Sequence, residues 1–222
     1  MNIKSTAREK ILSNLRKSSF VPNIKSHAYP VMDNKLWSLK EKVEQLKIKM
    51  EADHSEVLLC SKNSWGEIFR SVVKEKNIEK ILCGINTDLD QSLHEMYQNT
   101  PEEIPKLVNY EKPIEDSKEI LFDIDAAITT TRGGIAETGS LIIWPTPEEP
   151  RLMSLIPPIH IAVLYADTIY NTFMEAMTTE KWNFGMPSNA LLISGPSKTA
   201  DIEQTLVYGV HGCKELVVIL IQ

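Results

Sequence analysis

The stretch DAAITTTRGGIAETGSLIIWPTPEEPRLMSLIPPIH, residues 125–160, decides how the fold of this chain is predicted. It contains two apolar runs typical of buried strands, Ala126–Ile128 and Leu141–Trp144. Between these runs lie three consecutive threonines, a glycine pair, one carboxylate and a third glycine. So much polar and flexible chemistry is a poor design for a core alone. It suits a loop at the end of a sheet, where α/β proteins hold their ligands.

The centre of this stretch has the composition of an anion-binding loop. Gly133 and Gly134 can adopt positive φ and bring backbone N–H groups close to an anion. Arg132 adds a charged fork that suits phosphate or carboxylate. The hydroxyl donors come from Thr129, Thr130 and Thr131. One interpretation is a cradle for phosphate, CoA or a carboxylic acid, and the other is a tight turn with solvated threonines. The pattern is neither a P-loop nor a dinucleotide fingerprint, so nucleotide binding does not follow.

A second cluster contains Arg151 and His160. The proline pair at 157–158 fixes the chain before the apolar run Ile159–Leu164, which predicts that His160 begins a strand at a sheet-edge position. A neutral imidazole there could act as an acid or base near pH 7. The alternative is that it only bonds to the backbone.

A third cluster follows the apolar run Ala190–Ser194. It contains Ser197, Asp201, Glu203 and, between two glycines, His211. On an extended chain the two carboxylates share a face, and with the histidine they would form a polar site. We predict that this cluster and the glycine loop meet at the carboxyl edge of one sheet. The sequence predicts no metal there, because the histidines lack the usual ligand spacing.

These motifs also carry a family resemblance. The segments RGGIAETGS, RLMSLIPPIHIAV and ISGPSKTADIEQTLVYGVHG begin at residues 132, 151 and 193. In this order they resemble the LutC/YkgG branch of the lactate-utilization, or LUD-domain, family. The resemblance covers roughly the last two-thirds of the chain. One departure is Cys213, which stands where the family pattern GVHGP has proline.

The resemblance implies a NagB/RpiA/CoA-transferase-like fold, a three-layer Rossmann-like α/β sandwich. Periodicity alone indicates an α/β protein, because apolar strand-like runs alternate with helical patterns after about residue 55. In the run Leu216–Ile221 apolar residues do not alternate with polar ones, which is typical of a strand covered on both faces. We expect residues 1–52 to form an N-terminal helical extension and residues 53–222 to form the LUD-type domain. A second helix, at about Asn34–Met50, would pack on this domain or on another subunit.

The resemblance also offers a role for Glu137, which lies two residues before Gly139. CoA transferases of similar fold use a glutamate beside a glycine as a nucleophile that forms an acyl-anhydride intermediate. The alternatives are a ligand or subunit contact, a helix cap, or pairing with Arg132 or Arg151. We also predict that Gly139 contributes to ligand binding.

Composition limits the classes of partner. The 222 residues are 42% hydrophobic and 24% charged, with a formal net charge of −6, as in ordinary soluble domains. Basic blocks interleaved with aromatics are missing from the sequence, which argues against nucleic acid. The first residues lack a signal-peptide core, and apolar runs fall short of the roughly 20 residues that span a bilayer. We therefore expect a cytoplasmic protein without membrane contact.

The three cysteines, Cys60, Cys83 and Cys213, are scattered and form no C-x-x-C motif. They predict neither an iron–sulfur nor a zinc site, and we expect no bound cofactor. The resemblance implies a role in L-lactate utilization, in which lactate is converted to pyruvate alongside iron–sulfur partner proteins. Because this chain lacks the cysteines for electron transfer, we expect it to be a substrate-binding or assembly subunit.

Two alternatives stay open. The first alternative to a lactate-utilization subunit is a stand-alone superfamily enzyme acting on a phosphorylated or CoA-linked metabolite. The second is a module that senses a small carboxylate. The sequence decides neither whether the isolated chain is catalytic nor whether it forms a homo-oligomer.

Overall fold

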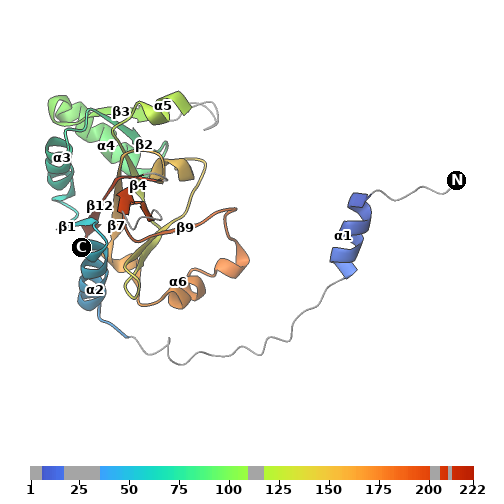
Figure 1. The fold of residues 1–222 in the computed structure, drawn as a ribbon. Helices are drawn as coiled ribbons and strands as arrows, with labels where there is room; N and C mark the ends of the chain where they lie inside the picture. The colour runs from blue at the N-terminus through green and yellow to red at the C-terminus, as the bar shows by residue number, and fades with distance from the viewer. Residues whose placement is uncertain (1–6, 18–35, 110–117, 201–205, 210–211) are drawn as a thin grey trace. The chain divides into compact units, whose positions relative to one another are not determined.

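The computed structural model describes residues 7–17, 36–109, 118–200, 206–209 and 212–222. The chain divides into two compact units, Met1–Asn34 and Lys35–Gln222. The first contributes helix α1 (Ala7–Lys17), which carries exposed Ile11 and Leu12. The second holds the sheets and the remaining helices (Figure 1). None of the described helices is long and apolar enough to span a membrane.

The centre of the second unit is a six-stranded sheet in which every pairing is parallel, with the order β1-β12-β7-β4-β2-β3. Its strands, in chain order, are β1 (Glu56–Cys60), β2 (Lys80–Cys83), β3 (Lys106–Asn109), β4 (Ala126–Thr130), β7 (Ile159–Tyr165) and β12 (Glu215–Ile221). Strand β12 is buried at every position after Glu215, as its unbroken apolar sequence predicted. The predicted α/β fold is confirmed.

One face of this sheet is covered by α3 (Trp65–Glu75) and α4 (Asp88–Asn99). Phe69 and Leu93 from these helices are fully buried and belong to one apolar cluster with sheet residues such as Ile128. The helices form because apolar residues recur at three- and four-residue steps, which places them on one face.

The opposite face is covered by α2 (Leu39–Ala52), which begins with a capping box between Ser38 and Glu41. Its buried residues Val43, Leu46 and Met50 pack on the sheet in a second cluster. Helix α2 thus packs on its own chain. The structure divides the chain before α2, after Asn34, and not after residue 52 as expected, because this apolar stripe is part of the sheet's core.

A second sheet lies on the same face as α2. The sequence predicted strands at Leu141–Trp144 and Ala190–Ser194, but not that they belong to a separate sheet. Its order is β8-β5-β6-β9, with strands of two to four residues: β5 (Gly133–Ile135), β6 (Ser140–Ile143), β8 (Ile169–Tyr170) and β9 (Leu191–Ile193). Leu141 and Ile143 join the cluster beneath α2, whereas Ile135 and Ile142 pack on the other side. That outer side is covered by α6 (Phe173–Thr179) and the 3-10 helix η5 (Trp182–Phe184).

Short elements complete the unit. Leu121 of α5 (Lys118–Phe122) and Met153 of η3 (Arg151–Ser154) pack on Leu82 and Ala127, beside strands β2 and β4. The others are η1 (Pro101–Glu103), η4 (Ala166–Thr168) and the antiparallel pair β10 (Lys198–Ala200) and β11 (Leu206–Tyr208).

Candidate functional site

The sheet topology singles out the carboxyl ends of β2 and β4. These strands are neighbours, but the chain leaves β2 toward β3 on one side and leaves β4 toward β7 on the other. Two connections that diverge from adjacent strands leave a crevice between them, and open α/β sheets bind ligands there. The side chains at this point therefore define the candidate site.

Glu149 is the charged group that lies over both strand ends. Its carboxylate accepts hydrogen bonds from the backbone N–H of Thr130, at 3.1 and 3.2 Å, and from the Thr130 hydroxyl. The turn that carries it is closed by Thr146, whose hydroxyl accepts from Glu149 N at 3.1 Å. Burial raises the pKa of Glu149, and the hydrogen bonds from Thr130 oppose that rise. A carboxyl group with a raised pKa is suited to exchanging protons.

Gly84, directly after β2, permits this approach. A Cβ at this position would lie 2.7 Å from Glu149 Cγ and 3.0 Å from the carbonyl oxygen of Glu148. Only glycine leaves room for the turn to cross the strand end. The sequence analysis missed Glu149. The available signal was its place between two prolines immediately after an apolar strand.

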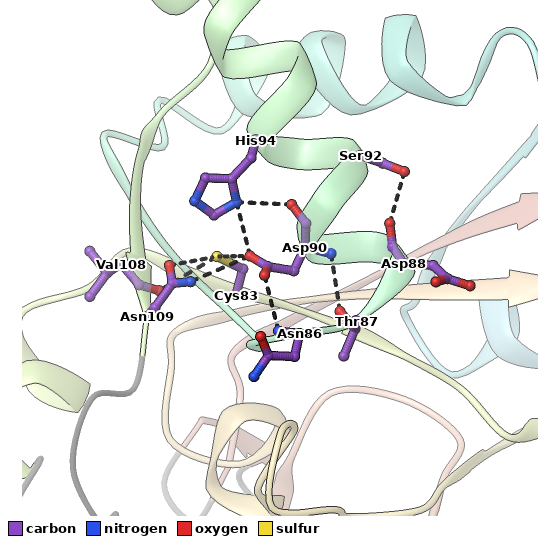
Figure 2. A network of polar contacts seen from close by, with 9 residues as sticks. All are labelled: Cys83, Asn86, Thr87, Asp88, Asp90, Ser92, His94, Val108 and Asn109. Atoms are coloured by element: carbon purple, nitrogen blue, oxygen red, sulfur yellow. Dashed lines mark hydrogen bonds and ion pairs between the residues drawn. The ribbon is translucent and has the colours of Figure 1, made fainter.

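A polar network adjoins this site at the ends of β2 and β3 (Figure 2). The carboxylate of Asp90 accepts from Asn86 N at 3.1 Å and from Asn109 Nδ2 at 3.3 Å, and it lies 2.9 Å from His94 Nδ1. Cys83 Sγ lies 3.2 Å from Asn109 Oδ1. Burial, and then the charge of Asp90, raise the pKa of this thiol to about 12, so Cys83 is no thiolate nucleophile near neutral pH.

Among the residues predicted for a site, Thr130 lies at these strand ends, bonded to Glu149, and Arg151 lies close to Glu149 in sequence. Arg151 begins η3, two residues after Glu149. Its side chain is exposed and makes no ion pair with the residues that the structure describes. The other predicted residues are distributed over different parts of the fold.

Arg132 lies in a separate cluster. Its guanidinium pairs with Glu180 and lies 5.7 Å from the ring centroid of Trp144. The hydroxyl of Tyr170 also donates to Glu180, at 2.6 Å, and this bond is the main reason that the pKa of Glu180 is lowered. The positive charge of Arg132 is therefore largely balanced within the protein.

The glycine pair does not form the predicted open loop. Gly133 and Gly134 are buried in β5, which is paired with β6 on one side and β8 on the other. The neighbouring strands thus occupy both edges of this backbone, and neither glycine has positive φ. A Cβ on Gly134 would lie 2.6 Å from Leu46 Cδ1, so the pair permits close packing. Thr131 donates from both its N–H and its hydroxyl to Val163 O.

The expected sheet-edge position of His160 is wrong. The imidazole is fully buried in β7, between β12 and β4, and its Nε2 lies 2.9 Å from the hydroxyl of Thr129. Burial lowers the pKa of His160 to about 4, so the ring is neutral near pH 7. Its Nδ1 has no partner among the described atoms.

Glu137 and Gly139 lie in the turn between β5 and β6. The N–H of Glu137 donates to Asn171 O at 3.0 Å, and Gly139 closes the turn with a φ of 62°. Next to this turn, Ser140 Oγ lies 2.7 Å from Ser194 Oγ. The chain segments next to the glycine loop and the third cluster are therefore in contact here, between β6 and β9.

They do not converge on one edge of the main sheet. Ser197 N donates to Cys213 O, and Lys198 pairs with Asp53, which places this segment near the amino ends of β12 and β1. Thr130 lies at the opposite, carboxyl edge. The predicted site residues Asp201, Glu203 and His211 lie outside the described residues, and their roles stay predictions.

The cysteines are dispersed, as their spacing suggested. Cys60, Cys83 and Cys213 are all buried free thiols, and burial raises the pKa of each. Within the described ranges, His, Cys, Asp and Glu side chains do not gather in threes as metal ligands.

Comparisons with known proteins agree with this fold. The LUD domain family model matches residues 43–221. An uncharacterized protein from Neisseria meningitidis serogroup B is 36% identical over 221 residues, which cover 97% of this chain and 94% of that protein. Lactate utilization protein C 1 from Bacillus mycoides is 29% identical, covering 78% of this chain and 75% of its own.

Lactate utilization protein C from Oceanobacillus iheyensis is 24% identical, covering 92% of this chain and 94% of its own. Among solved structures, a DUF162 family protein from Deinococcus radiodurans superposes with a TM-score of 0.60 at 20% identity. That match covers 84% of this chain and all of the other, and it supports the α/β fold. With the family model spanning most of its length, the chain belongs to the LUD domain family.

Proposed function

We propose that this protein is a component of an L-lactate utilization system, in which it binds the substrate while iron–sulfur partner proteins carry the electrons from lactate to form pyruvate. The names of its Bacillus and Oceanobacillus relatives support a role related to lactate. The carboxyl-edge site supports the binding role, because it combines a carboxyl group whose pKa burial raises with an exposed arginine two residues further along the chain.

The position of Glu149 carries this proposal. Lactate has a carboxylate next to a carbon that bears a hydroxyl group. In the proposed complex Arg151 pairs with the substrate carboxylate, a geometry that guanidinium groups favour. Glu149, oriented by Thr130, accepts the proton of the substrate hydroxyl. Oxidation to pyruvate would also remove the hydrogen on the carbon that bears the hydroxyl group, as a second proton released to solvent, and two electrons, which the clusters of the iron–sulfur partner would accept one at a time.

Calorimetric titration of the purified chain with L-lactate and pyruvate tests the binding step. A charged hydrogen bond is worth roughly 1.5–3 kcal/mol, so Arg151→Ala should weaken binding by about one to two decades. Arg70→Ala is the matched control, since Arg70 pairs with Glu103 outside this site. Equal affinity of the wild type and Arg151→Ala for both ligands would contradict the proposal.

The partner step is tested by co-expression with cysteine-rich iron–sulfur proteins. The expected result is co-purification and lactate-dependent reduction of the clusters, which Glu149→Gln slows. Turnover of a phosphorylated or CoA-linked metabolite by the isolated chain would instead favour a stand-alone enzyme. Lactate binding without turnover and without partners would favour a sensing module.

A further inference from the structure

A groove lies along the other part of the carboxyl edge, between α2 and the ends of β1, β12 and β7. It has a volume of about 840 Å³, within the range of small-molecule sites. Three apolar side chains that line it are buried, Val43, Ala166 and Ile221. Three others are partly exposed, Leu39 at 49%, Leu59 at 44% and Tyr165 at 42%.

An exposed apolar surface of this size is unusual on an edge strand. Strand β1 is at the edge of the sheet, and exposed apolar side chains on an edge strand promote association. Leu59 lies on this strand, next to the first turns of α2 in the same groove. Concave apolar surface of this kind is typical of a binding site.

Three lysines and two carboxylates line the groove. Lys40, Lys47 and Lys62 line it, against Glu44 and Asp167, although the whole chain has a net charge of −6. Lys47 is already engaged, because its Nζ donates to Val57 O at 2.8 Å and pairs with Glu51 at 3.0 Å.

The other two lysines differ from Lys47. Neither Lys40 nor Lys62 makes an ion pair or hydrogen bond with the part of the chain that the structure describes. Two available ammonium groups beside an apolar surface complement a ligand that has an apolar body and an anionic end.

We propose that this groove binds a small amphipathic anion, with its apolar body over Val43, Leu59 and Ile221 and its carboxylate or sulfonate toward Lys40 and Lys62. The carboxyl ends of parallel strands are the usual place for such a ligand. The site is distinct from the Glu149 site, since it is built on β1, β12 and β7 rather than β2 and β4. It does not depend on the proposed role in lactate utilization.

Fluorescence titration of the full chain with anilinonaphthalene sulfonate, followed by displacement with decanoate, tests this proposal. We expect saturable binding of the dye and competition by decanoate. Decanol, which has the same apolar chain without the charge, should compete at least tenfold more weakly. Equal competition by decanol, or dye binding that does not saturate, would overturn the proposal.

Charge-reversal variants assign the site. Lys62→Glu and Lys40→Glu should each weaken decanoate binding by about tenfold or more, the lower end of a charged hydrogen bond. Lys74→Glu is the matched control on α3, where the lysine is also exposed. Decanoate affinity that is unchanged in both groove variants would refute the assignment, provided that circular dichroism shows folded protein.

The main competing occupant is a second copy of this chain. Sedimentation of wild type and Leu59→Asp at several concentrations distinguishes the two. A single mass for both proteins, with weaker decanoate binding by the variant, supports the ligand site. A dimer that Leu59→Asp dissociates, with no saturable decanoate binding, would make the groove an interface between subunits and overturn the proposal.

Discussion

The two parts of the carboxyl edge share the same parallel backbone but differ in chemistry. Over β2 and β4, a turn held by hydrogen bonds brings Glu149 against the strand ends. Over β1, β12 and β7, the side chains of α2 leave an open apolar groove with lysines around it. Parallel strands therefore fix where a site forms, whereas the segments packed around their ends decide which ligand chemistry it offers.

The largest expected effect comes from removing the wall of the groove. Deleting residues 1–52 removes Val43, Leu46 and Met50, all buried under the sheet face. Each comparable core truncation costs about 2–5 kcal/mol, so this deletion should prevent stable folding. Deleting residues 1–34 leaves the second compact unit whole. Urea unfolding of both proteins is the measurement. A cooperative, fully stable 53–222 fragment would instead support the division first expected after residue 52.

The next effect concerns His160, on the strand where the two parts of the edge meet. Its pKa in the folded protein, about 4, is below its ordinary 6.5, so the unfolded chain gains a proton first as the pH falls. Stability should therefore be complete above about pH 6.5 and decline toward pH 4, by up to about 3 kcal/mol.

His160→Gln removes this titration and should flatten the decline between pH 6.5 and 4. Urea unfolding at several pH values measures it, with His94→Gln on the exposed face of α4 as the control. The same pH dependence in His160→Gln and wild type would show that other groups cause the acid destabilisation.

A smaller effect should come from blocking the approach of Glu149. Gly84→Val places new atoms against Glu149 Cγ and Glu148 O, which must move. Overpacking of this kind costs typically about 1–3 kcal/mol. It should also weaken L-lactate binding without changing decanoate binding in the groove. Gly185→Val is the control, since nothing lies within 4 Å of a Cβ there. If both variants are destabilised equally, contact with Glu149 is not the cause of the destabilisation by Gly84→Val.

The smallest effect is the pH dependence that Glu149 itself contributes. Because its pKa is raised in the folded protein, the folded state holds this proton more tightly than the unfolded chain. Its contribution to stability is therefore largest at low pH and is lost as the pH rises through the folded pKa. Glu149→Gln keeps an oxygen for Thr130 N and should equal or exceed wild type near pH 7.5. Thermal unfolding at pH 4 and 7.5 measures this, and the difference in stability between Glu149→Gln and the wild type should be smaller at pH 4.

The comparison of the two parts also shows what sequence patterns can predict. The central strands β7 and β12 were predicted because each is a nearly continuous apolar run, and burial on both faces requires such runs. In the second sheet, the apolar runs at β6 and β9 were predicted as strands, but β5 and β8 were not, because they have only three and two residues, too few for a periodic pattern. Without these two strands, no pattern in the sequence indicated that β6 and β9 belong to a separate sheet.

The candidate site could be predicted only in part. Thr130 follows an apolar run and lies at the expected edge, but Glu149 reaches that edge from a distant turn. The pair Gly133–Gly134 was misinterpreted because glycine marks both turns and close packing between strands, and sequence alone does not separate them.

By itself the sequence determined the α/β class, the strands of the main sheet and the LUD family motifs, since each depends on local composition or order along the chain. Tertiary structure decided the rest. It buried His160 between strands, paired Arg132 with Glu180 and placed Glu149 across Gly84. These outcomes depend on contacts between residues far apart in sequence. The energy of such a contact depends on burial and geometry, which no local pattern specifies.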